Sequence, residues 1–167
     1  MKTVFLSLGS NVGDRDSHLA RTLERLASAD IRVIRASGVY ETEPRDMQDQ
    51  PWFLNQVVEV ETSLFPKQLL TRLQKIEAAM GRVRTRAQGP STPPKGPRTM
   101  DIDILFYGSS IVSTPGLEIP HPRLTDRRFV LEPLAELAPD FRHPRTRQTV
   151  REMLAQVSYQ KVHRVTA

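Results

Sequence analysis

The segment GPRTMDIDILFYG, Gly96 to Gly108, places two aspartates in a strand-like pattern. Successive side chains of a strand point to opposite faces, so Asp101 and Asp103 lie on one face, roughly 6–7 Å apart along the backbone. An isolated pair of this kind is also common on half-exposed strands whose acids are only solvated. The opposite face is expected to join the core through Met100, Ile102, Ile104 and Phe106.

The pattern around this segment predicts an α+β fold. Strands or extended segments are expected at residues 2–8, 31–36, 38–42, 53–61 and 99–107. Helices are expected to begin near Asp16 or Ser17, at Pro66, at Arg127 and at Val150. Gly9-Ser10-Asn11 is interpreted as a turn, and loops are expected at residues 43–51, 82–97 and 115–122. Because strands and helices do not alternate throughout, we expect a ferredoxin-like, split βαβ core with a mainly antiparallel sheet.

Length and composition suit one cytoplasmic domain, expected to span residues 1–167 as a monomer. The chain has 167 residues, 38% of them hydrophobic, which allows a sizeable core. It contains no cysteine, which excludes disulfides and thiolate metal sites and favours a reducing compartment. The first apolar run is too short for a signal peptide, and no run is long enough to span a bilayer.

Positive charge is concentrated in one expected loop. The net charge is +5, and residues 82–98 hold five basic side chains and no acidic one. A basic balance of this kind suits anionic partners, either nucleic acid or phosphorylated small molecules, although a solvated basic loop is equally common.

Acids and arginines next to each other suggest phosphoryl-type transfer. Arg98 precedes Asp101 by three residues, beyond a Gly-Pro turn. Carboxylate oxygens favour a hard cation such as Mg²⁺, which bridges phosphates, while arginines neutralise the remaining charge. The sequence contains neither a Walker motif nor a protein-kinase signature, so any ATP binds by another route.

Three further patterns could contribute to a site, although each alone is more often ordinary core or surface. Phe53 and Asn55 share a strand face and could stack on a flat heterocycle and hydrogen-bond its edge. Gln74 and Glu77 lie three apart on a helix, away from its apolar stripe. His121 stands between two prolines, and the arginines that follow it could contact phosphate; these are Arg123, Arg127 and Arg128.

Several blocks in the same order make the chain resemble the 6-hydroxymethyl-7,8-dihydropterin pyrophosphokinase family of the folate pathway. They are LSLGSNVGDR (6–15), YETEP (40–44), QDQPWFLNQVV (48–58), LLTRLQKIEAAMGRVR (69–84), GPRTMDIDIL (96–105) and IPHPRLTDRRFVLEPLAELAP (119–139). The resemblance covers nearly the whole chain.

The resemblance implies transfer of the terminal diphosphate of ATP to the hydroxymethyl oxygen of a reduced pterin, with release of AMP. It implies two Mg²⁺ ions held by Asp101 and Asp103, and Arg82 and Arg98 stabilising phosphate from mobile loops. The implied nucleotide site comprises Gln74, Glu77, Arg84, Ile104, His121 and Arg127. The implied pterin site comprises Thr42, Phe53, Asn55 and Phe129, with the two phenyl rings around the heterocycle. Glu77 is also expected to help order the catalytic loop.

Four positions depart from the family's usual residues. Lys95 replaces a large aromatic, and Pro94 replaces a basic residue. Pro122 stands where an aromatic is expected, and Gly116 where a phosphate-facing arginine is common. None of the four touches the aspartate pair or Arg98, so the resemblance still implies activity, with nucleotide affinity most affected.

Two alternatives accompany the resemblance. A nucleic-acid-binding module on a ferredoxin-like sheet would fit the positive charge. However, such modules stack bases on exposed aromatics, and here aromatic content is 6% and two aspartates face the same side. The second alternative is a family member that binds pterin without catalysis. The retained aspartates and arginines argue against it. ATP and a reduced pterin are therefore the expected partners, without nucleic acid or membrane.

Overall fold

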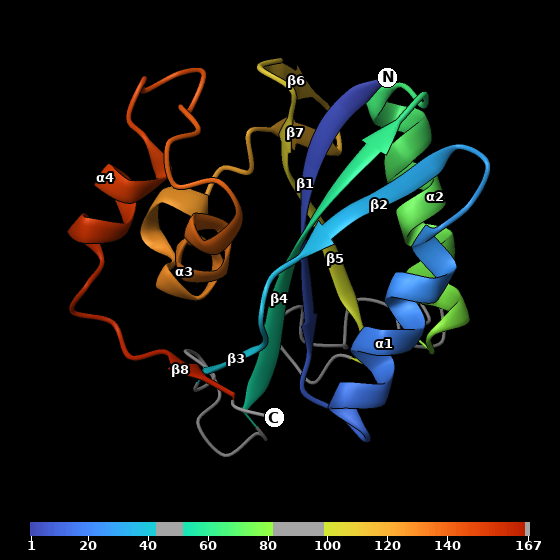
Figure 1. Ribbon diagram of the computed structural model, residues 1–167. Helices are drawn as coiled ribbons and strands as arrows, with labels where there is room; N and C mark the ends of the chain where they lie inside the picture. The colour runs from blue at the N-terminus through green and yellow to red at the C-terminus, as the bar shows by residue number, and fades with distance from the viewer. Residues whose placement is uncertain (43–51, 82–98, 166–167) are drawn as a thin grey trace.

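The computed structural model describes residues 1–42, 52–81 and 99–165, and its elements are arranged around one central sheet (Figure 1). The helices are α1 (Arg15–Leu26), α2 (Pro66–Ala79), η1 (Leu124–Asp126), α3 (Arg128–Leu137) and α4 (Val150–Gln156). The strands are β1 (Lys2–Ser10), β2 (Ile31–Ala36), β3 (Tyr40–Thr42), β4 (Phe53–Thr62), β5 (Asp101–Tyr107), β6 (Val112–Thr114), β7 (Leu117–Ile119) and β8 (His163–Arg164). Within the described residues, we find no helix with the length and apolar character needed to cross a membrane.

The main sheet has the order β5-β1-β4-β3-β8, and β2 also pairs with β4. All of these pairings are antiparallel. Helices α1 and α2 cover one face, and α3 and α4 lie on the other (Figure 1). The α+β class with a mainly antiparallel sheet is thus confirmed. The ferredoxin-like core stays a prediction. Strands β3 and β8 extend the sheet beyond the four strands of such a core.

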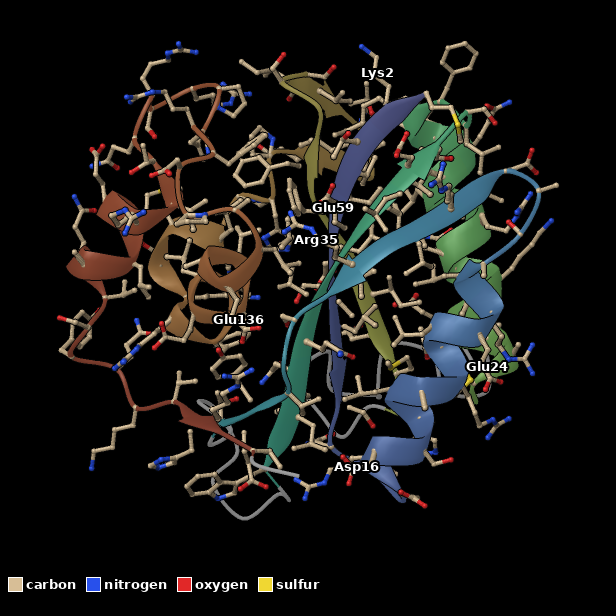
Figure 2. The ribbon with its side chains drawn as sticks, in the orientation of Figure 1. Lys2, Asp16, Glu24, Arg35, Glu59 and Glu136 are labelled. Carbon is tan, nitrogen blue, oxygen red and sulfur yellow. The ribbon has the colours of Figure 1, made fainter. Side chains whose placement is uncertain are left out.

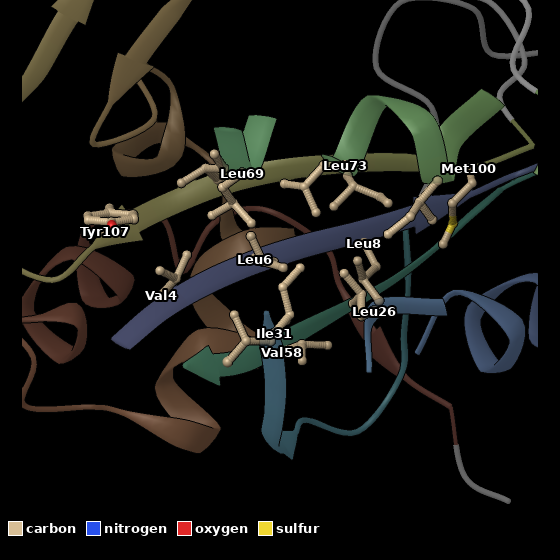
Figure 3. Close-up of a cluster of buried hydrophobic side chains, with 14 of the residues drawn as sticks. Val4, Leu6, Leu8, Leu26, Ile31, Val58, Leu69, Leu73, Met100 and Tyr107 are labelled. Atoms are coloured by element: carbon tan, nitrogen blue, oxygen red, sulfur yellow. The ribbon is translucent and has the colours of Figure 1, made fainter. Parts of the chain in front are cut away.

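The face under α1 and α2 is a continuous apolar core (Figure 3). Alternate residues of β1, among them Leu6 and Leu8, are fully buried there, as the period of two requires. Helix α2 contributes Leu69 and Leu73 at helical spacing, and Leu26 closes the core from α1. This core holds the middle strands in place.

The face under α3 and α4 has a second apolar core that covers only part of it. A register shift in the β1–β5 pairing leaves Leu105 without an opposite residue, since Leu6 faces Ile104 and Phe5 faces Phe106. Leu105 and Phe106 both join this second core. The prediction that Phe106 shares a face with Ile102 and Ile104 is therefore wrong, because the bulge reverses the alternation.

Other boundaries also differ from those expected. Strand β1 runs on through Gly9 and Ser10, because both pair with β4 instead of turning. Helix α1 is capped by Asp14, whose side chain accepts a hydrogen bond from Ser17 N at 3.2 Å. The expected loop at 115–122 contains β7, which forms a hairpin with β6 just before it. Its turn places Gly116 at φ +81°, which a side chain such as arginine would adopt only with strain.

Candidate active site

One row of residues crosses five strands on the face under α3. Asp101 lies opposite Gly9, Gly9 opposite Asn55, Asn55 opposite Tyr40, and Tyr40 opposite Arg164. Directly opposed residues of antiparallel strands project to the same face. With neighbouring strands about 4.8 Å apart, Asp101 and Asn55 are roughly 10 Å apart across the sheet.

The two aspartates occupy the β5 end of this row. Asp103 lies opposite Ser7, one pleat further along β1, and both aspartates are half-buried. The predicted shared face for the two carboxylates is confirmed by this register. Strand β5 is held at this point from the other face by α2.

Glu77 is the residue of α2 that holds β5. Its carboxylate accepts a hydrogen bond from Ile102 N at 2.8 Å, between the two aspartates, and the side chain is only 5% exposed. The expectation that Glu77 lies away from the apolar stripe of α2 is wrong, since it is buried among Leu73 and Ile76. Glu77 thus fixes the backbone that carries both aspartates. Gln74, three residues earlier, is exposed.

Asn55 and Thr42 form the β3–β4 part of the face. Asn55 Nδ2 donates to Thr42 Oγ1 at 2.9 Å, and both side chains are buried. This bond orients the Asn55 amide, so that its carbonyl oxygen is left to accept from another group. Phe53 lies on the same face of β4 and is half-buried.

Gly9 provides the space between the two parts of the row. A Cβ at this position would lie 3.3 Å from Asn55 Oδ1 and 3.9 Å from the Phe53 ring. Any side chain would therefore press on the Asn55 amide from the aspartate side. Sequence reasoning missed Gly9 because it interpreted the residue as part of a turn, and only the β1 register could have indicated its place.

Phe129 belongs to the first turn of α3, which packs on β3 and β4. It is half-buried, and the Arg127 guanidinium lies over its ring at 5.5 Å from the centroid. This is within the range of a cation–π contact. Helix α3 therefore brings an aromatic ring and a cation to the side of the sheet that carries the row.

His121 is held in the segment that leads into this helix. Its backbone N donates to Leu105 O at 3.1 Å, and its Nδ1 accepts from Arg123 N at 3.2 Å. Burial, assisted by Arg127 and Arg123, lowers the pKa of His121 to about 4, while the charge of Asp101 acts in the opposite direction. The imidazole is therefore neutral at pH 7, and its Nε2 carries the proton as a donor.

The remaining positions singled out in the sequence fall into three groups. Ile104 is buried in the core under α1 and α2, on the face of β5 opposite to the aspartates. Arg82, Arg84 and Arg98, together with Pro94 and Lys95, lie outside the described residues. Pro122 is exposed next to His121.

A separate pocket lies on the other side of β3. It has a volume of about 500 Å³ and is lined by Asn11, Gly13, Arg15, Glu41 and Trp52. Arg15 Nη1 donates to Glu41 Oε2 at 3.1 Å and to the Trp52 carbonyl at 2.6 Å. Glu41 alternates with Tyr40 and Thr42, so this pocket opens away from the row described above.

The sequence is similar to those of known proteins. Residues 5–139 match the family described as 7,8-dihydro-6-hydroxymethylpterin-pyrophosphokinase (HPPK). A 2-amino-4-hydroxy-6-hydroxymethyldihydropteridine pyrophosphokinase of Methylorubrum extorquens is 44% identical over 166 residues, covering 99% of both chains. The folic acid synthesis protein fol1 of Pneumocystis carinii is 43% identical over 145 residues. The match covers 87% of this chain but 19% of that protein, so this chain spans about a fifth of such longer relatives.

Solved structures agree at the level of the fold. Wild-type Plasmodium falciparum HPPK-DHPS in a crystal structure with pteroate matches 93% of this chain and 44% of that chain, with a TM-score of 0.72. The sequence identity in this match is 16%, so the likeness concerns the fold alone. On the family match and the relatives above, the chain belongs to the 7,8-dihydro-6-hydroxymethylpterin-pyrophosphokinase family.

Proposed function

We propose that this chain transfers the terminal diphosphate of ATP to the hydroxymethyl oxygen of 6-hydroxymethyl-7,8-dihydropterin, in folate biosynthesis. The observation that carries the proposal is the row of Asp101, Gly9 and Asn55 across three adjacent strands. It sets a pair of carboxylates and a buried, oriented amide on one face, with a gap between them. This suits one substrate that carries phosphates and another that carries a polar heterocycle.

The pterin is assigned to the β3–β4 end. Asn55, oriented by Thr42, would read the edge of the heterocycle, and a buried amide of this kind discriminates strongly because a mismatched edge leaves it unpaired. Phe53 and Phe129 would lie against the two faces of the ring. Aromatic side chains suit a flat heterocycle through stacking and desolvation.

The aspartates fit a magnesium site. Within the described residues, no group of three or more His, Cys, Asp or Glu residues could hold a metal ion by themselves. Two carboxylates suffice for Mg²⁺, which is typically held by one or two of them together with substrate phosphates. Following the resemblance to the family, we assign two Mg²⁺ ions to Asp101 and Asp103. When bound, they would neutralise charge on the triphosphate and orient it.

Positioning and charge would supply most of the rate enhancement. The hydroxymethyl oxygen attacks the β-phosphorus in line and loses its proton to solvent, the bond from that phosphorus to the α,β-bridging oxygen breaks, and AMP leaves with that oxygen. Glu77 keeps the aspartate strand in register, and neutral His121 can donate from Nε2 to a phosphate oxygen. Arg127, with Arg82, Arg84 and Arg98, is assigned to balance negative charge during transfer.

The proposal extends to the setting of the enzyme. We place it in the cytoplasm as a monomer, with ATP and a reduced pterin as its partners. The nucleic-acid-binding alternative lacks comparable support, since the face that would hold bases carries Asp101 and Asp103.

The test is product analysis with purified protein, ATP and Mg²⁺, with and without 6-hydroxymethyl-7,8-dihydropterin. We expect AMP only when the pterin is present, in equal amount to the pterin diphosphate. Release of ADP, or AMP formation independent of pterin, would contradict the proposal. Asp101→Asn should abolish turnover, whereas the matched control Asp140→Asn, at an exposed residue in the turn after α3, should not.

A further inference from the structure

The last described strand, β8, lies next to the proposed pterin strand. It pairs antiparallel with β3, with Arg164 opposite Tyr40 and His163 opposite Glu41. Val165 N also donates to Val39 O at 2.8 Å. These residues lie outside the part of the chain that matches the family, which ends at residue 139. Strand β3 has only three residues, and β8 covers the side of it that β4 does not.

One carboxylate connects β8 and Val165, together called the tail here, to both the sheet and α3. Glu136, near the end of α3, points toward β3 (Figure 2). Its Oε2 accepts from Gly38 N at 3.0 Å, and its Oε1 accepts from the Tyr40 hydroxyl at 2.5 Å. Arg164 Nη2 lies 3.5 Å from Oε1. Hydrogen bonds from Tyr40 and Gly38, with Arg164, hold the pKa of Glu136 below its usual value despite burial, so it accepts as an anion.

A second contact ties β8 to the start of β4. The His163 ring stacks on Trp52 with centroids 6.3 Å apart and planes at 17°. Trp52 directly precedes Phe53, and its carbonyl is held by Arg15. The tail therefore contacts the residue before β3, Val39, and the residue before β4, Trp52.

Gly38 shows that the Arg164 side chain needs space beside β3. A Cβ at Gly38 would lie 2.7 Å from both Nε and Nη2 of Arg164, closer than real Cβ contacts occur. Gly38 does not have a positive φ, so alanine fits its backbone. An alanine here would displace the Arg164 guanidinium without removing any charge.

From this arrangement we propose that β8 is a positioning element for the pterin site, with Arg164 acting through Glu136. The proposal rests on the proposed function. Glu136 fixes β3, which carries Thr42, to the same helix that carries Phe129 in its first turn. The tail thereby sets the distance between the amide that reads the pterin and one of the rings that cover it. Asp101 lies at the opposite end of the row, four strands from β8, so ATP binding should be insensitive to the tail.

The test is a double-mutant cycle on Gly38 and Arg164 in the full chain. Binding of 6-hydroxymethyl-7,8-dihydropterin is measured by fluorescence titration with Mg²⁺ and α,β-methylene-ATP, whose α,β linkage cannot be cleaved. We expect Arg164→Ala and Gly38→Ala each to raise the pterin Kd about two- to fivefold, the range of one partly exposed ion pair. The double variant should equal Arg164→Ala alone, because the alanine then meets no guanidinium.

Three further variants sharpen the result. Arg164→Lys should restore part of the affinity, and removal of residues 163–167 should weaken pterin binding on the order of tenfold, since backbone hydrogen bonds are also lost. Arg151→Ala is the matched control, because its ion pair with Asp140 is exposed and remote from β3. In steady state the KM for pterin should rise while the KM for ATP stays constant. Equal weakening of ATP and pterin, or additive effects in the cycle, would overturn the proposal.

A readout independent of catalysis separates this proposal from the proposed function. Hydrogen–deuterium exchange of the peptide that contains Tyr40–Thr42 should be faster in the truncated chain, while exchange in β1 and β5 is unchanged. If the intact enzyme makes no pterin-dependent AMP, the proposed function fails, whereas this measurement still tests whether β8 positions β3. Unchanged exchange at β3 would show that β8 does not position it.

Discussion

The two faces of the central sheet differ in how they use the same alternation of side chains. Under α1 and α2, β1 buries Val4, Leu6 and Leu8 in an unbroken apolar core. Under α3, the same strand presents Phe5 to a second core, and then Ser7 and Gly9 to the aspartates and Asn55. One face thus stabilises the fold along its whole length, and the other gives up apolar contacts at one end to form a polar row. Substitutions on the two faces should therefore separate stability from function.

The largest effect is expected at Asp101, on the polar face. Asp101→Ala should lower kcat/KM by about 10³-fold or more, because the transferred phosphates lose a charge-stabilising partner. The free energy of unfolding should change little, since the side chain is half-buried and faces away from the apolar core. Product formation and chemical denaturation measure the two quantities. Near-normal turnover would show that Asp101 does not hold the metal.

The opposite outcome is expected at Leu6, one residue before Ser7 on β1. Leu6→Ala should lower the free energy of unfolding by about 2–5 kcal/mol, because the residue is fully buried and leaves a cavity between β1 and α2. Turnover per folded molecule, measured well below the unfolding transition, should remain close to that of the wild type. A large loss of turnover at full folding would mean that the two faces are not independent.

Gly9→Ala tests the gap in the polar row. The new Cβ would meet Asn55 Oδ1 at 3.3 Å, so the amide must shift by a few tenths of an ångström. We expect the KM for pterin to rise about tenfold with a smaller change for ATP, since misplacement of a positioning group is costly. Ser7→Ala on the same strand face, away from Asn55, is the comparison. Equal effects on both substrates would place Gly9 outside the pterin side.

The last prediction concerns pH and His121, where the effect appears only under acidic conditions. The unfolded chain binds a proton at this histidine near pH 6.5, whereas in the folded chain the pKa is about 4. As pH falls from 6.5 to 4, the unfolded state therefore binds more protons, and the folded state loses stability. His121→Asn should lose less stability across that window than the wild type, as denaturation at several pH values would show. The pKa of His143 is also lowered by burial, but His143 is present in both proteins, so its contribution to the pH dependence of stability cancels in the comparison.

Local patterns predicted much of this molecule. The shared face of Asp101 and Asp103, the shared face of Phe53 and Asn55, and the apolar stripe of α2 all follow from the strand and helix periods. Predictions failed where a distant partner decided the outcome. Gly9 belongs to a strand because β4 and β5 pair with it on both sides, and Glu77 is buried because Ile102 N, on another element, needs an acceptor.

The sequence alone determined the residue types at the site, their alternation along each strand and the family to which the chain belongs. Only the tertiary structure decided the register that aligns Asp101, Gly9, Asn55, Tyr40 and Arg164 in one row. The physical reason is the range of the interactions. Periodicity acts over a few neighbouring residues, whereas a strand's partner and register depend on contacts between residues more than a hundred positions apart, as between Tyr40 and Arg164.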